Sequence, residues 1–249
     1  MKISIVTVAF NAEKTIRDTI NSVLSQKGVD LEYVIIDGKS TDQTVPIIQE
    51  FKNQIDQFVS EADQGIYDGM NKGVKLAKGD IIGILNSDDF YWDDKVLQKV
   101  THLFEDETVD GVYADLVYVD AADTNKITRA WKSGDYKKGA FKKGWMPPHP
   151  TFFVRKQVYE KYGAYSLDLK SAADYEFMLR TIHKHEIKIA YLPEIIVKMR
   201  AGGVSNASLK NRLKANREDR MAWKMNKLKP SMWTFIRKPL SKVGQFFKK

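Results

Sequence analysis

Over its first hundred residues, the chain alternates four times between a short apolar run and a segment with helical periodicity. The apolar runs lie at residues 3–8, 31–36, 58–59 and 81–85. Their β-branched side chains are typical of strands that are buried on both faces of a sheet. The first helical segment places Ile16, Ile20 and Val23 on one face, and Asn11 precedes it as a candidate N-cap. The alternation predicts an α/β fold built on a doubly wound, mostly parallel sheet with flanking helices.

The pattern changes after residue 108. Residues 112–119 and 127–131 alternate between apolar and polar side chains, which predicts antiparallel strands. We then expect a loop, a strand, two helices and two closing strands, at residues 139–150, 152–154, around 158, 174–183, 187–192 and 195–199. No linker interrupts the chain before residue 200. The sequence therefore predicts one domain at residues 1–204, followed by a helical extension at residues 205–249.

The formal net charge of the 249-residue chain is +8, and it is unevenly distributed. Residues 205–249 hold 13 Lys and Arg against two acidic residues, a net charge of +11, which leaves the remainder near −3. An acidic body and a basic end call for separate explanations. The absence of cysteine excludes disulfides, thiolate zinc sites and a cysteine nucleophile. Without an 18-residue apolar run or a signal-peptide pattern, we expect neither a transmembrane helix nor secretion.

Polar residues gather where each predicted strand ends. Phe10 and Asn11 follow the first strand, Asp37 the second, Asp63 the third, and the pair Asp88 and Asp89 the fourth. Ligands of such sheets bind at the carboxyl ends of the strands, so this edge is the predicted site. The first turn lacks the glycines of a dinucleotide-binding loop, and no P-loop or serine-hydrolase motif is present. NAD enzymes, P-loop NTPases and serine hydrolases are therefore disfavoured.

The adjacent carboxylates of Asp88 and Asp89 are the strongest local signal. Neighbouring carboxylates repel each other unless a cation is present, and hard oxygen ligands favour Mg²⁺ or Mn²⁺. The competing interpretation is an acidic turn that caps the next helix.

Four motifs occur in order at residues 6–11, 37–44, 78–80 and 86–89: Val-Thr-Val-Ala-Phe-Asn, Asp-Gly-x-Ser-x-Asp-x-Thr, Lys-Gly-Asp and Asn-Ser-Asp-Asp. Together they resemble family 2 glycosyltransferases, which have the Rossmann-like glycosyltransferase A fold. Residues 60–73 are similar to the members that build bacterial surface polysaccharides of the O-antigen, capsule or colanic-acid type. The resemblance covers about residues 1–205 and implies that this domain binds a nucleotide-sugar and an acceptor.

The resemblance implies specific roles for the strand-end residues. Thr7, Phe10 and Asn11 correspond to the motif that holds the nucleotide base, with Phe10 stacking on it. Asp37 corresponds to the carboxylate that accepts the base N–H, uracil being the commonest base. Asp63 is expected near the base or ribose, and Gly65 allows close approach of the backbone. Asp88 is expected to contact ribose or metal, and Asp89 to be the main ligand of a Mn²⁺ or Mg²⁺ that bridges the diphosphate.

Two positions depart from the family pattern. Phe10 stands where the family often has tyrosine, so it retains stacking but lacks the hydroxyl. Asn86 holds the first position of a metal motif that often begins with aspartate. Asn86 can still hydrogen-bond ribose, but it adds no charge to the metal site.

Inverting transfer needs a base to take the proton of the acceptor hydroxyl. Asp174 occupies the family's usual base position; the alternative role is an N-terminal helix cap, and Glu176 is a lesser candidate for the base. His149, between two prolines, faces either the acceptor or diphosphate, or the core. Arg200 begins a glycine turn that is either a lid, with Arg200 neutralising the leaving diphosphate, or a plain loop.

The basic end continues the helical pattern from Ser205 to Pro230. Beyond it, apolar side chains recur at helical spacing beside a cationic face: Trp233, Ile236, Leu240, Val243 and Phe247. Such segments lie in the membrane interface, where each basic residue contributes about 1 kcal/mol. We expect peripheral attachment to the cytoplasmic face of the plasma membrane and an acceptor saccharide on a lipid diphosphate. A disordered basic tail or a helix packed on the body are the alternatives.

Three functional hypotheses follow. The first is an inverting, metal-dependent glycosyltransferase of cell-surface polysaccharide biosynthesis, which uses a UDP-sugar. The second is a nucleic-acid-binding protein, disfavoured because the basic charge is confined to one end and the predicted pocket is acidic. The third is a sugar-phosphate nucleotidyltransferase, disfavoured because a glycine-rich basic loop is missing after the first strand.

Overall fold

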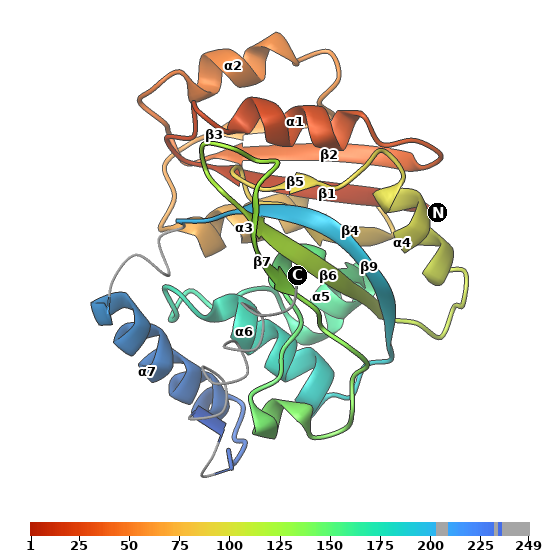
Figure 1. The fold of residues 1–249 in the computed structure, drawn as a ribbon, viewed down its shortest axis with the longest axis vertical. Helices are drawn as coiled ribbons and strands as arrows, with labels where there is room; N and C mark the ends of the chain where they lie inside the picture. The colour runs from red at the N-terminus through yellow and green to blue at the C-terminus, as the bar shows by residue number, and fades with distance from the viewer. Residues whose placement is uncertain (203–208, 232–233, 236–249) are drawn as a thin grey trace.

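The computed structural model describes residues 1–202, 209–231 and 234–235. Within these residues, nine strands form one sheet (Figure 1). They are β1 (Lys2–Ala9), β2 (Asp30–Asp37), β3 (Gln57–Ser60), β4 (Ile81–Ile84), β5 (Phe90–Tyr91), β6 (Gly111–Val119), β7 (Ile127–Trp131), β8 (Phe153–Arg155) and β9 (Ile189–Arg200). Their order is β3-β2-β1-β4-β8-β6-β9-β5, with β7 paired to β6.

The predicted α/β architecture is confirmed, and the sheet is mixed. β1 to β4 are parallel, and β6 and β9 are parallel to each other. β8 runs antiparallel to β4 and β6 and so joins the two halves. β6 and β7 form the predicted antiparallel pair.

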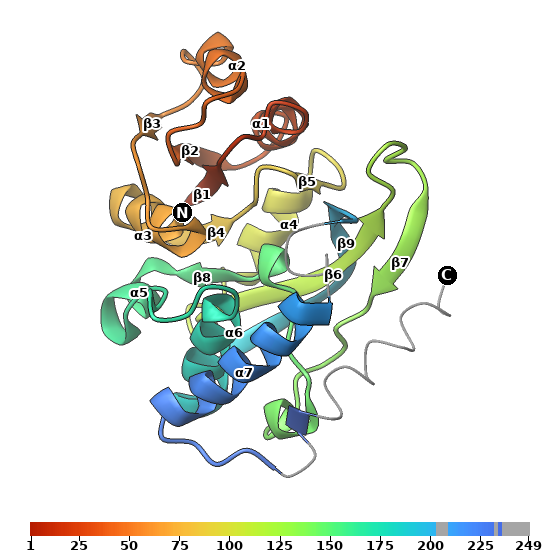
Figure 2. The same ribbon diagram turned by 90° about the vertical axis from the view of Figure 1, so that its left-hand side faces the viewer.

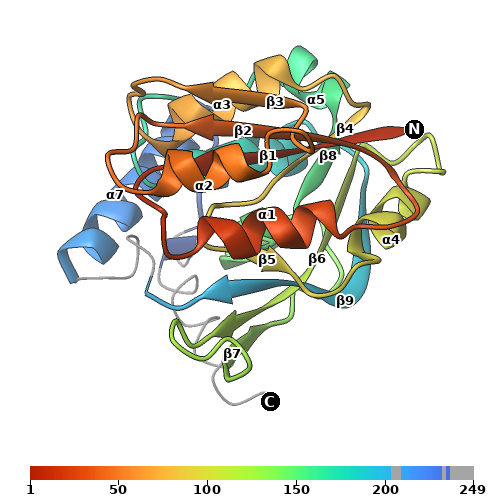
Figure 3. The ribbon, with the colours of Figure 1, turned by 90° about the horizontal axis from the view of Figure 1, so that it is seen from above.

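Helices cover both faces of the sheet, because side chains alternate between the two faces of each strand. Ile3 and Ile5 of β1 pack with α1 (Ile16–Leu24), α2 (Thr44–Glu50) and α4 (Val96–Leu103). Val6 and Val8 pack with α3 (Ile66–Leu76), α5 (Lys156–Tyr162) and α6 (Ala173–Met178). Figure 3 shows α1 and α3 on opposite sides of β1 and β2. Three short helical segments are also present: η1 (Ala140–Lys143), η2 (His149–Thr151) and the π-helical η3 (Leu179–Lys184).

Two glycines of the segment at residues 60–73 lie where α3 contacts β1 closely. A Cβ atom on Gly69 or Gly73 would collide with Val8 or Val6, respectively. These glycines therefore let α3 lie directly on β1 and bring its first turn to the carboxyl edge of the sheet.

Two local predictions were wrong. The expected strands at residues 187–192 and 195–199 are the single strand β9, in which the register passes from Ala114 opposite Leu192 to Asp115 opposite Ile195. A bulge at Pro193, which has no N–H to donate, absorbs the extra residues. Asn11 does not cap α1, which begins at Ile16 after Thr15.

The described part of the basic extension contains α7 (Leu209–Met225), which lies beside α6 (Figure 2). The indole of Trp223 is 1% exposed and donates to the hydroxyl of Tyr175 at 2.8 Å. Glu218 accepts hydrogen bonds from the N–H groups of Lys170 and Ser171, just before α6. Helix α7 is therefore packed on the body. The domain boundary at residue 204 stays a prediction.

The five residues of the apolar stripe predicted to meet the membrane lie outside the described residues: Trp233, Ile236, Leu240, Val243 and Phe247. Among the helices that the structure does describe, none combines the length and apolarity needed to span a bilayer.

Candidate active site

The parallel strands bring the predicted polar residues to one edge, as expected. Ala9, Asp37 and Ser60, the last residues of β1, β2 and β3, are neighbours in the sheet register. β4 lies on the other side of β1 and leads directly into residues 86–89. The turns after four strands therefore share the carboxyl edge of the sheet.

Phe10 forms an exposed aromatic surface at this edge. Its side chain is 62% exposed, which is high for a large apolar residue. A Cβ on neighbouring Gly38 would lie 3.4 Å from the Phe10 ring and 2.5 Å from Oδ2 of Asp63, so both side chains border this glycine. Oδ1 of Asp63 accepts the N–H of Gly65 at 2.9 Å, and Gly65, the N-cap residue of α3, has a φ of +117°. The arrangement presents an open ring face beside a carboxylate and exposed backbone.

Two residues expected to touch the base are inaccessible. The hydroxyl of Thr7 accepts a hydrogen bond from Tyr33 at 3.2 Å, and Thr7 is 0% exposed. Asp37 is also 0% exposed, and its carboxylate accepts from the N–H of Ser40 at 3.0 Å and from the hydroxyls of Ser40 and Ser60. Neither side chain is accessible to a base in this structure, and their role in base binding stays a prediction. The Asp37 carboxylate links the turn after β2 to the end of β3, and Thr7 joins β1 to β2.

Asn11 also has a local role. Its φ is +49°, its Oδ1 accepts the N–H of Thr41 at 2.9 Å, and its own N–H donates to Ser40 at 2.8 Å. Asn11 therefore ties the turn after β1 to the turn after β2, and it remains exposed to solvent.

Asp89 is a buried carboxylate with unused hydrogen-bonding capacity. The residue is 0% exposed, and its Oδ2 accepts the side-chain amide of Asn86 at 3.2 Å. Among the described residues, Oδ1 of Asp89 and Oδ1 of Asn86 are buried without a partner. Burial, and then the nearby charge of Asp88, raise the pKa of Asp89 well above its usual range. Burial likewise raises the pKa of the partly exposed Asp88.

These features fit a divalent cation. Orphaned buried oxygens are costly, and hard oxygen donors are the ligands that Mg²⁺ and Mn²⁺ take. Over residues 1–202, 209–231 and 234–235, no group of three or more His, Cys, Asp or Glu side chains gathers as a complete metal site. Asp88 and Asp89 would therefore hold a cation together with oxygens of a bound substrate.

Arg200, at the end of β9, braces this pair. It is 7% exposed, donates to the main-chain carbonyl of Asp88 at 2.8 Å and forms an ion pair with Asp18 of α1. Its guanidinium also lies over the ring of Phe90 at 4.8 Å. This geometry supports a bracing role, and residues 203–205 of the predicted glycine turn lie outside the described residues. No sequence motif indicated Asp18.

Asp174 lies in the first turn of α6 and does not cap the helix. The N-cap is Ala172, and no side-chain capping bond is formed there. Oδ1 of Asp174 instead accepts a hydrogen bond from the hydroxyl of Tyr67, on α3, at 2.9 Å. The capping role considered from sequence is therefore not observed.

His149 belongs to the interior beside Asp174. It is 8% exposed, and its Nε2 forms a 2.9 Å hydrogen bond with the hydroxyl of Tyr165. Burial lowers the pKa of His149, and the charge of Asp174 opposes this only in part. His149 is thus a buried, hydrogen-bonded residue, one of the two roles that the sequence left open.

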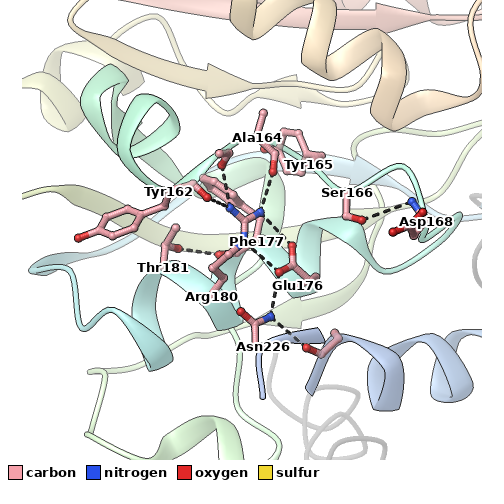
Figure 4. A network of polar contacts seen from close by, with 12 residues as sticks. Tyr162, Ala164, Tyr165, Ser166, Asp168, Glu176, Phe177, Arg180, Thr181 and Asn226 are labelled. Atoms are coloured by element: carbon pink, nitrogen blue, oxygen red, sulfur yellow. Dashed lines mark hydrogen bonds and ion pairs between the residues drawn. The ribbon is translucent and has the colours of Figure 1, made fainter. Parts of the chain in front are cut away.

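Glu176, the lesser candidate for the base, is committed to a structural network (Figure 4). It is 3% exposed, pairs with Arg180 at 2.9 Å and accepts the side-chain amide of Asn226 at 2.8 Å. Arg180 in turn donates to the carbonyls of Gly163 and Ala164. Glu176 therefore ties the loop before α6 and the end of α7 to α6, and it is unsuited to act as the base.

With this geometry in place, comparison with known proteins identifies the family. The family model for Glycosyl transferase family 2 matches residues 4–163. The chain belongs to glycosyl transferase family 2. A PGL/p-HBAD biosynthesis glycosyltransferase of Mycobacterium tuberculosis is 29% identical over 207 residues, covering 82% of this chain and 78% of the relative. An uncharacterized glycosyltransferase of the same species is 31% identical over 181 residues, covering 72% and 68%.

Solved structures share the fold of this glycosyltransferase. S. aureus TarS in complex with UDP-GlcNAc has a TM-score of 0.69 at 18% identity, covering 91% of this chain and 65% of that one. The mannosyltransferase PcManGT from Pyrobaculum calidifontis, in complex with GDP-Man and Mn²⁺, has a TM-score of 0.68 at 16% identity, covering 98% and 69%. The glycosyltransferase A fold is confirmed, and of the three functional hypotheses the glycosyltransferase is the one that family membership supports.

Proposed function

We propose that this glycosyltransferase moves a sugar from a UDP-sugar, with inversion, to a hydroxyl of a lipid-diphosphate-linked saccharide in cell-surface polysaccharide biosynthesis. The observation that carries the proposal is the unpartnered Oδ1 of buried Asp89 beside Asp88, at the edge where Phe10 is exposed. A buried carboxylate next to a second carboxylate is unfavourable without a cation, and a nucleotide-sugar supplies the diphosphate that completes such a site.

The donor site is proposed to lie over Phe10. The exposed ring offers a stacking surface for a pyrimidine, and Asp63 beside it offers an acceptor for the base N–H or a ribose hydroxyl. Gly65, Asn86 and Asp88 line the route from the base to the diphosphate. Structural neighbours in complex with UDP-GlcNAc and GDP-Man support a nucleotide-sugar, and UDP is our choice because of the family resemblance.

Asp88 and Asp89 are proposed to hold Mn²⁺ or Mg²⁺. When bound, such a cation offsets the negative charge that develops on the leaving diphosphate. Arg200 holds the Asp88 main chain in place and lies close enough to influence the charges of both carboxylates. The neighbour that contains Mn²⁺ supports the choice of ion.

Asp174 is proposed as the general base of a single displacement. The acceptor hydroxyl gives its proton to a carboxylate oxygen of Asp174 while the acceptor oxygen forms a bond to the anomeric carbon. The bond between that carbon and the diphosphate oxygen breaks, and the nucleoside diphosphate leaves with the electron pair. Attack opposite the leaving group inverts the anomeric configuration.

Donor binding is the first prediction. In the presence of Mn²⁺, the protein is expected to bind at least one UDP-sugar in a calorimetric titration. Base stacking on an aromatic ring contributes about 1–3 kcal/mol, so Phe10→Ala should weaken binding by roughly tenfold or more, and Phe10→Tyr should retain it. Absence of binding, hydrolysis and transfer with all common UDP- and GDP-sugars would remove the proposal.

Membrane attachment is the second prediction. The full chain is expected to sediment with vesicles containing anionic lipid, and to be released by high salt, because the extension has a net charge of +11. A chain that ends at residue 231 retains α7 but lacks the apolar stripe, and it should remain in the supernatant. Equal sedimentation of the two chains would contradict the proposal that residues after 231 attach the protein to the cytoplasmic face of the membrane.

A further inference from the structure

The carboxylate of Asp174 is held by a side chain that comes from a distant part of the sequence. The hydroxyl of Tyr67 donates to its Oδ1 at 2.9 Å, across 107 residues of chain. Among the described residues, no other side chain hydrogen-bonds this carboxylate. The orientation of Asp174 relative to the sheet edge therefore depends on where α3 places Tyr67.

Tyr67 is itself fixed on α3. It is 8% exposed, and its ring stacks on Tyr165 with 5.9 Å between the centroids. Asn71, one turn further along α3, donates to the carbonyl of Tyr165 and accepts its N–H, both at 2.9 Å. Helix α3 thus supplies Tyr67 and, through Asn71, also holds Tyr165, which packs against Tyr67.

We propose that Tyr67 is the positioning residue of the general base: its hydroxyl ties down Oδ1 of Asp174, so that Oδ2 is the oxygen that takes the acceptor proton. The proposal rests on the proposed function of Asp174. It gives a role to a tyrosine of the segment at residues 60–73 whose hydrogen bond and ring contact, among the described residues, are to Asp174 and Tyr165.

The groups that face Asp174 make Tyr67 the relevant proton donor. Tyr165 approaches from the loop before α6, and His149 from η2. Burial lowers the pKa of His149, which favours its neutral form. Burial and the charge of Asp174 raise the pKa of Tyr67 well above its usual range, so its hydroxyl retains its proton throughout the assay range. Glu176, on the same helix as Asp174, is neutralised by Arg180.

Removing the Tyr67 hydroxyl should make the ionised form of Asp174 less favourable. In Tyr67→Phe, the acidic limb of the kcat/KM profile for transfer is expected to move upward by about one pH unit, because a hydrogen bond to a charged group is lost. The same shift is expected in an NMR titration of ¹³C-carboxyl-labelled aspartate, which needs no substrate; the Asp174 signal is the one absent from Asp174→Asn. Donor affinity should remain within about twofold.

Tyr159→Phe is the matched control. Tyr159 is 6% exposed, against 8% for Tyr67, and its hydroxyl bonds the hydroxyl of Tyr165 at 3.1 Å, not Asp174. A purely structural role predicts a similar loss of Tm and an unshifted titration in both variants. Replacing Tyr67 with 3-fluorotyrosine nearly preserves the shape and makes the hydroxyl a stronger hydrogen-bond donor, so this protein is expected to fold and to shift the titration downward.

The outcomes separate the two claims. An unshifted Asp174 titration in Tyr67→Phe or the fluorotyrosine protein, or an equal shift in Tyr159→Phe, overturns the positioning role while leaving the base intact. Full transfer by Asp174→Asn refutes the base itself, and with it the proposal that rests on it.

Discussion

Asp174→Asn is expected to lower the rate of sugar transfer by about 10²–10⁴-fold, because an amide cannot accept the proton of the acceptor hydroxyl. Donor affinity should be unchanged, since Asp174 lies in α6 and bonds Tyr67, while the proposed donor site lies over Phe10. The fold should also be preserved, because the amide oxygen still accepts the Tyr67 hydroxyl and Asp174 caps no helix. The measurement is a single-turnover transfer assay paired with a calorimetric donor titration.

Asp123→Asn provides the control for this experiment. It makes the same chemical change on the exposed β6–β7 turn and should leave both the rate and the affinity unaltered. Loss of donor binding together with transfer in Asp174→Asn would place Asp174 in the donor site and not at the base. Unchanged transfer would overturn the assignment altogether.

Asp89→Asn is expected to have opposite effects on activity and stability. Transfer should fall by at least about a hundredfold, because the proposed cation, which would offset several kcal/mol of developing charge, would lose its main ligand. In metal-free protein at neutral pH, Tm should rise by at least about 2–4 °C, because a buried, incompletely bonded carboxylate is replaced by a neutral amide. The new amide also gives the buried site a donor beside the orphaned Oδ1 of Asn86.

The pH dependence of this stability gain has a defined sign. The pKa of Asp89 is raised in the folded state, so the folded protein binds the proton more tightly than the unfolded chain. The favourable contribution of Asp89 to folding stability is complete below its ordinary pKa of 3.8. This contribution is lost as the pH rises toward the pKa of Asp89 in the folded state. The gain from Asp89→Asn should therefore be absent near pH 3.5 and grow at higher pH. Melting curves in chelator across this range test it, and a lower Tm for the variant at neutral pH would contradict the account.

The local patterns of the sequence predicted the part of the site that depends on parallel strands. Strand ends at one edge follow from the alternation of elements, so the convergence of Phe10, Asp63 and Asp89 could be expected before the structure. The direction of a side chain at that edge could not. Asp37 and Thr7 turn into the protein because Ser40, Ser60 and Tyr33 provide hydrogen-bonding partners there.

Contacts between distant segments were beyond the reach of sequence patterns. Tyr67 lay inside a recognised motif, yet its bond to Asp174 spans 107 residues. Asp18, the partner of Arg200, is an exposed acidic residue on α1. Its ion pair depends on the tertiary contact with Arg200 at the end of β9. The packing of Trp223 and Glu218 on the body likewise depends on tertiary structure, because periodicity describes the faces of a helix but not what covers them.

The central claim is metal-dependent, inverting transfer from a UDP-sugar, and the most direct test is the anomeric configuration of the product. The protein would be incubated with the UDP-sugar selected by calorimetry, a synthetic lipid-diphosphate GlcNAc or GalNAc acceptor, and either Mn²⁺ or EDTA, and the product examined by NMR. The account predicts a glycoside of opposite anomeric configuration to the donor, formed with Mn²⁺ and not with EDTA. A product of retained configuration, or equal transfer in EDTA, would contradict it.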